Sequence, residues 1–103
     1  MSASEVLLSD EALYQLASIP SNDDYHRVMR ALQALATFPL MGKAYEPLNQ
    51  APAPPAGTRV LYAGHYGVYH LHEHDETTDE VRVLSISDQR RNPRERFIFT
   101  EPR

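Results

Sequence analysis

The sequence predicts an α+β domain in which an N-terminal strand and a helical hairpin pack on a mainly antiparallel β-sheet. Between Thr58 and Asp88, three stretches of apolar and β-branched residues alternate with short polar connections. Short connections favour antiparallel pairing, because parallel pairing needs a crossover of about a dozen residues or more. Two stretches upstream repeat apolar residues at helical spacing. A chain of 103 residues is long enough for one hydrophobic core and too short for two, so residues 1–103 form one predicted domain.

The first part of the chain predicts a strand followed by two helices. The short apolar stretch from Glu5 to Ser9 is typical of an edge strand. Ser9 or Asp10 is a suitable N-cap for a first helix that ends at Pro20, and Ser21 is suitable for a second helix that ends at Pro39. Two helices joined by so short a link form a hairpin, which needs an apolar surface beneath it. We expect the sheet to supply that surface.

The remainder predicts one irregular segment and then the sheet. Phe38 to Gly57 has no regular pattern and ends in a Pro/Ala segment, so we expect a surface loop without strands. The predicted strands are Thr58–Ala63, Tyr66–His74 and Val81–Ser87, with a turn at Gly64–His65 and a loop at Asp75–Asp79.

Composition narrows the class of protein. The formal net charge is −4, so the overall field repels nucleic acid and acidic membranes. There is no cysteine, no apolar run near the ~20 residues of a membrane span, and no signal-peptide pattern, which together predict a cytoplasmic protein. The charge is unevenly distributed, since acids crowd the stretch 73–80 and arginines crowd the last fourteen residues. A polyanion would therefore have to approach the arginine-rich end.

With this order of elements, the chain resembles the RelE/ParE superfamily of bacterial toxins. The resemblance is carried by LSDEALYQLASIP, by FPLMGKAYEPL and by the tract from Arg59 to Pro93. In that family an arginine opens the first core strand, as Arg59 does, and a Gly-aromatic turn leads to the next strand, as Gly64 to Tyr66 does. The last strand ends in a polar step and a paired basic motif, as in the segment 88–93.

The resemblance implies the toxin component of a type II toxin–antitoxin system, held inactive by an antitoxin with which it forms a dimer or heterotetramer. One branch of the family cleaves messenger RNA on the ribosome without a metal. Another branch inhibits DNA gyrase and cuts no RNA. The resemblance implies no cofactor and no membrane partner, and the branch must be chosen from residues, because a fold does not determine a function.

The residues at the expected nuclease centre depart from the family pattern. The arginine that follows the central-strand tyrosine is replaced by Gly67, after Tyr66. The terminal tyrosine is replaced by Phe97, and Lys43 is the only lysine of the chain. Metal-free RNA cleavage needs a base for the 2′-hydroxyl and cations for the phosphate. The remaining catalytic candidates are Arg59 and Arg91 as cations and His65 as the base.

Further residues are candidates for binding RNA or the antitoxin: Arg90, Arg94, Arg96, Tyr66 and Phe97. Arginine forks bind phosphate and carboxylate in a bidentate manner, and tyrosine rings can stack on bases, although tyrosines in a sheet more often fill its core. An equally good interpretation of Arg90 and Arg91 is a solvated strand end or a surface for an acidic partner. We expect protein binding first, with an acidic or apolar antitoxin segment covering the concave sheet face and residues 90–96. Ribonuclease activity, gyrase inhibition and an inactivated toxin all stay open.

Three histidines alternate along the second predicted strand, at positions His70, His72 and His74. Imidazoles on one side of a strand are conceivable zinc or nickel ligands. We expect His70 to lie under the helices, His72 to be half-buried and His74 to be exposed. Alternate side chains on a straight strand are roughly 7 Å apart, which is wide for joint coordination. The sequence therefore predicts no metal site, and a metal-binding protein that uses these three histidines stays open as a third alternative.

Overall fold

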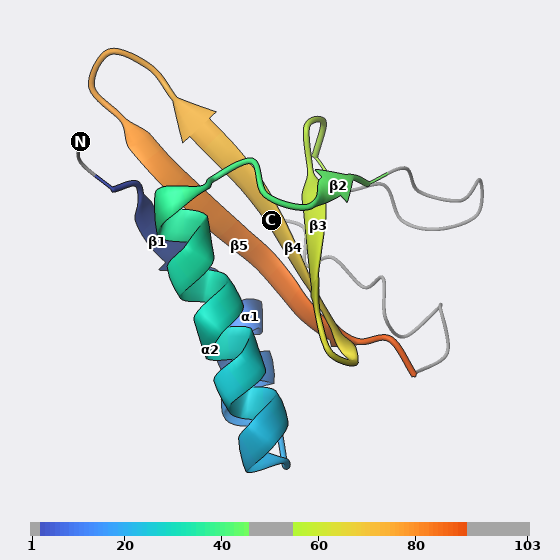
Figure 1. Ribbon diagram of the computed structural model, residues 1–103. Helices are drawn as coiled ribbons and strands as arrows, with labels where there is room; N and C mark the ends of the chain where they lie inside the picture. Colours follow the sequence, from blue (N-terminus) through green and yellow to red (C-terminus); the bar gives the residue numbers. More distant parts are fainter. Residues whose placement is uncertain (1–2, 46–54, 91–103) are drawn as a thin grey trace.

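The computed structural model describes residues 3–45 and 55–90, and its elements follow the predicted order (Figure 1). They are β1 (Glu5–Leu8), α1 (Asp10–Ala17), α2 (Asn22–Thr37), β2 (Lys43–Ala44), β3 (Arg59–Ala63), β4 (Tyr66–His74) and β5 (Asp79–Asp88). Both helices lie on one face of a single sheet, which gives a two-layer α+β domain. No helix in the described ranges is long and apolar enough to cross a membrane.

The sheet has the strand order β1-β5-β4-β3-β2. The neighbours β2–β3, β3–β4 and β4–β5 are antiparallel, which confirms the predicted meander. The expected N-terminal strand, β1, is an edge strand and pairs in parallel with β5, so the sheet is mixed. Gly64, with φ 62°, is the first residue of the two-residue turn between the paired residues Ala63 and Tyr66. Glycine in that position is typical of a type II′ hairpin turn.

The first helix begins at a serine that also ties it to the sheet. The Ser9 hydroxyl accepts a hydrogen bond from the amide of Ala12 at 3.0 Å, as predicted for an N-cap. The Ser9 amide donates to the Val83 carbonyl at 3.0 Å. β1 ends one residue before Ser9. Without this bond, the backbone groups of β5 beyond β1 would lack partners on the side that faces β1. Farther along the same edge, the Gln15 side-chain oxygen accepts from the Ile86 amide at 2.6 Å.

Ser21 caps the second helix in the same way, accepting from the Asp24 amide at 3.3 Å. The helix lays one apolar stripe on the sheet, and the buried core between the layers is formed by Ala12, Val28, Ala31, Leu32, Leu35, Ala63, Tyr66, Val68, Val81, Val83 and Ile86. On the opposite face a smaller cluster joins Val60 and Tyr69 with Tyr45, whose ring meets that of Tyr69 edge-on at 5.2 Å.

Two expectations about strand boundaries are wrong. The segment after α2 was expected to contain no strand, yet β2 pairs with the start of β3. The segment just before β2 is held by Arg59, which donates from Nε to the Leu40 carbonyl and from Nη2 to the Gly42 carbonyl, both at 2.8 Å. Asp79 was expected in a loop, yet it opens β5 opposite His74. The loop is shorter because the Asp75 carboxylate accepts the amides of residues 77 and 78 and closes the turn early.

The three histidines of β4 have the burial expected of them. His70 is completely buried on the face that carries Val68, and its cross-strand neighbour Val83 belongs to the core under the helices. His72 is half-buried and His74 is exposed. The His70 Nδ1 lies 3.1 Å from the Val68 carbonyl, whereas Nε2 has no hydrogen-bond partner among the described residues. Burial lowers the pKa of His70, so the native protein holds it neutral, although nearby backbone groups oppose the shift.

We expect this neutral histidine to make the fold acid-sensitive. The unfolded chain takes up a proton at position 70 as the pH falls through about 6.5, and the native state does not. The stability that the neutral His70 contributes is therefore present above that pH and lost below it. The free energy of unfolding should fall by at most about 1.4 kcal/mol per pH unit because of this residue. In urea unfolding between about pH 5 and 8, His70→Leu should remove this slope. Equal slopes for both proteins would contradict the account of His70.

Candidate functional site

Several of the predicted site residues meet where β3 turns into β4 and where β5 ends, at the lower end of the sheet in Figure 1. Tyr66 opens β4 and is paired with Asp88, the last residue of β5. His65, in the turn, accepts the Gln89 amide at its carbonyl oxygen at 2.7 Å. We call the set His65, Tyr66, Asp88 and Arg90, with Asp24 and Arg27 of α2, the β5-end cluster.

The outer part of the β5-end cluster is an ion pair between the exposed Arg90 and the half-buried Asp88. Arg90 donates from Nε to one Asp88 oxygen at 3.0 Å and from Nη2 to the other at 2.8 Å. The Arg90 amide also donates to Asp88 at 2.9 Å. This bidentate pair lowers the pKa of Asp88, chiefly through the side-chain hydrogen bond, and raises that of Arg90. Both groups are therefore fully charged at neutral pH, and neither can exchange a proton in that range.

The inner part is formed by a buried phenol and a helix start. Asp24 is nearly buried in the first turn of α2, with its Oδ1 3.7 Å from Nη1 of Arg27. Burial raises the pKa of the Tyr66 hydroxyl, and the charges of Asp88 and Asp24 raise it further, while Arg90 acts in the opposite direction. Tyr66 consequently stays protonated at neutral pH. Two carboxylates balance two guanidinium groups, so the β5-end cluster carries no large positive charge.

The burial of Tyr66 fits the interpretation of a sheet tyrosine as a core residue rather than a base-stacking one. Its ring is only 6% exposed and belongs to the core under the helices. A buried ring cannot stack on a nucleotide base or on a partner's side chain. Tyr66 therefore packs beneath the cluster, and His65, Arg90 and Arg27 are its exposed members.

Arg59 does not join the β5-end cluster. It opens β3, whereas His65 follows the end of that strand, and four steps of about 3.3 Å separate the two ends by roughly 13 Å. Its guanidinium is also directed away, toward the carbonyls of residues 40 and 42. The structure therefore does not bring Arg59 and His65 into one catalytic centre. Arg91, Arg94, Arg96 and Phe97 lie outside the described residues.

Sequence reasoning missed the carboxylate half of this site. Asp88 precedes Arg90 by two residues, a spacing that places two strand residues on one side and could have indicated the pair. Asp24 and Arg27 come from α2, sixty residues away in sequence, and no local signal connects them to β5. A second group, His72, His74 and Asp79, lies at the opposite end of the β4–β5 hairpin and also went unpredicted.

Comparison with known proteins does not place the chain in a family, because no protein-family description and no curated protein sequence matches it.

Proposed function

We propose that this chain is the toxin component of a type II toxin–antitoxin system of the RelE/ParE kind, and that it works in the cytoplasm by binding proteins. The observation that carries the proposal is the arrangement of the fold together with its last strand. A helical hairpin covers one sheet face, and the antiparallel strand β5 ends in an exposed arginine. This is the order of elements that the resemblance implies.

The positions of the candidate catalytic residues favour binding over RNA cleavage. A phosphate-cleaving centre needs its base and its cations around one phosphate group. Arg59 and His65 are at opposite ends of β3, and the Arg59 guanidinium holds backbone carbonyls. Arg90, the cation beside His65, is itself neutralised by Asp88. These contacts support the non-catalytic alternative, a gyrase inhibitor or an inactivated toxin that binds a protein partner.

The β5-end cluster is the surface we assign to the antitoxin. Arg90 is exposed and Asp88 is half-buried, and an ion pair at the surface contributes little to stability, so an incoming carboxylate can exchange with Asp88 at small cost. Arginine is enriched where proteins recognise planar carboxylates. An antitoxin segment with acidic residues would find Arg90 and Arg27 at one end of the sheet and would fold on docking.

The proposal is tested by controlled expression in a bacterial host, alone and together with the small reading frame next to its gene. We expect expression alone to stop growth and co-expression to restore it, with the two proteins purifying together as a heterodimer or heterotetramer. Inhibited supercoiling by purified gyrase would identify that branch. If the neighbouring protein does not bind the chain, the toxin–antitoxin assignment is wrong.

Ribosome-dependent cleavage of messenger RNA is the second candidate, because His65 is exposed in the turn whose carbonyl accepts the Gln89 amide, one residue before Arg90. In this reaction His65 would take the 2′-hydroxyl proton and the 2′-oxygen would attack the adjacent phosphorus. The bond from phosphorus to the 5′-oxygen would break, and that oxygen would receive a proton from water. Purified protein with translating ribosomes should then cut the message, and His65→Ala should lower the rate at least about 100-fold. If the messenger RNA stays intact, the ribonuclease candidate is wrong and only the binding function remains.

A further inference from the structure

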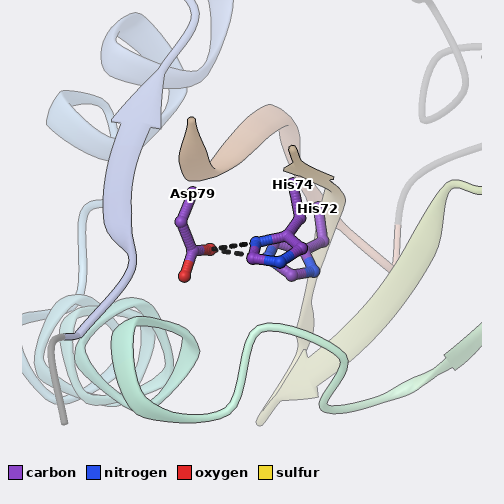
Figure 2. A group of neighbouring side chains, drawn as sticks. All are labelled: His72, His74 and Asp79. Carbon is purple, nitrogen blue, oxygen red and sulfur yellow. Dashed lines mark hydrogen bonds and ion pairs between the residues drawn. The ribbon is translucent and has the colours of Figure 1, made fainter. Parts of the chain in front are cut away.

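The end of the β4–β5 hairpin opposite the β5-end cluster gathers two imidazoles and a carboxylate. Figure 2 shows the rings of His72 and His74 lying over one another with the Asp79 carboxylate directed at both. The ring centroids are 5.6 Å apart and the planes are inclined by 30°. All three residues are on one face, since His74 is paired with Asp79 and His72 is two residues earlier on the same strand.

The distances fit a small divalent ion. Nε2 of His72 is 2.7 Å from Oδ1 of Asp79, and Nδ1 of His74 is 3.9 Å from the same oxygen. One ligand atom from each residue can be chosen so that all lie within 4.8 Å of one another. Ligand atoms about 2.0–2.2 Å from a tetrahedral zinc ion are roughly 3.3–3.6 Å apart. The observed separations lie on both sides of that range, so small side-chain rotations would suffice.

The surroundings support the carboxylate and leave the ion accessible. Ser4, which is buried and donates its amide to the Ala36 carbonyl, donates its hydroxyl to Oδ1 of Asp79 at 2.8 Å. A hydrogen bond of this kind orients a ligating carboxylate. His74 and Asp79 are exposed and His72 is half-buried, so an ion can enter from solvent and keep water on the open side. The many acids of the stretch 73–80 attract cations to this end.

We propose that His72, His74 and Asp79 form a binding site for a zinc-type divalent cation, with Ser4 as the residue that positions the carboxylate. Imidazole with a carboxylate suits zinc, nickel and copper, and three protein ligands leave a coordination position for water. The site differs from the conceivable set His70, His72 and His74, because His70 is buried in the core with Nδ1 directed at a backbone carbonyl. A bound ion would fasten β4 to β5 and, through Ser4, to the residues before β1.

The test is calorimetric titration of the full chain, without a histidine tag, with zinc chloride. We expect one zinc ion per chain, and a thermal unfolding midpoint that rises with zinc concentration, since ligands stabilise the state that binds them. His74→Ala and Asp79→Asn should each weaken binding at least about tenfold, and Ser4→Ala should weaken it by about tenfold through the carboxylate. His74 is exposed, so its variant should fold normally.

Two control variants separate this site from other histidines. His26→Ala removes an exposed imidazole on α2, and His70→Leu removes the buried one on β4. Both should bind zinc as the unmodified chain does. Absence of binding heat, equal affinity in the His74→Ala protein, or loss of binding in His70→Leu with the fold intact would each overturn the proposal. Growth inhibition is not part of this readout, so the result is independent of the proposed function.

Discussion

Arg90→Glu should weaken the complex with the antitoxin by about 100-fold or more. The substitution places a negative charge beside Asp88 on the surface assigned to an acidic partner segment, and opposed like charges in an interface are strongly unfavourable. The domain itself should stay folded, because the Arg90 side chain that is replaced is exposed and a surface ion pair contributes little to stability. Titration of the purified variant with the antitoxin would measure the loss.

Arg82→Glu is a closely matched control. Arg82 is 54% exposed and Arg90 59%, and each binds an acidic side chain two residues earlier through Nε and Nη2. The two arginines differ in position, since Arg82 lies near the end of β5 that carries the proposed metal site. We expect its reversal to change affinity less than about threefold. Equal losses in both variants would indicate a general charge effect and would contradict a specific role for the β5-end cluster.

Gly42→Ala should destabilise the domain by about 3 kcal/mol, the largest stability loss expected from a single methyl group here. Gly42 has φ 100°, a conformation that residues with a Cβ rarely adopt. A Cβ at this position would overlap the backbone of Val60, lying 2.8 Å from its carbonyl carbon, and a paired strand cannot move aside. The carbonyl that Arg59 binds belongs to the same glycine. Urea unfolding would measure the change.

Gly64→Ala provides the comparison for this prediction. Gly64 also has positive φ, at 62°, but an added Cβ would meet only the flexible side chain of Arg27, at 3.3 Å. We expect the free energy of unfolding to fall by about 1 kcal/mol, which is the cost of holding an alanine at positive φ without a steric overlap. If both alanine variants lost the same free energy, the close contact between Gly42 and β3 would not be a determinant of stability.

Local signals in the sequence were sufficient for every element except β2 and for most of the topology. The serines at 9 and 21 mark helix starts because a hydroxyl accepts a free amide wherever the helix packs. The strands β3, β4 and β5 follow from short connections, which permit only antiparallel pairing. β2 could not be predicted, because its two residues have no pattern of their own and depend on Arg59 for their position.

The candidate sites depend on tertiary placement and were therefore predicted only in part. Tyr66 and Arg90 were chosen from the sequence, whereas their proximity to Asp24 depends on the packing of α2 against the sheet. Arg59 was chosen for its charge, and only the structure reveals that its guanidinium binds carbonyls. Asp79 was placed in a loop, which hid its pairing with His74. In each case the deciding contact joins residues far apart or depends on the length of a turn.

A protein partner is proposed to dock on the β5-end cluster. Its position can be located by comparing amide hydrogen exchange in the free chain with exchange in the complex with the neighbouring gene product. Binding should slow exchange at the β3–β4 turn, the end of β5 and the first turn of α2. Slower exchange confined to the hairpin end around His74 and Asp79, with the β5-end cluster unchanged, would contradict it.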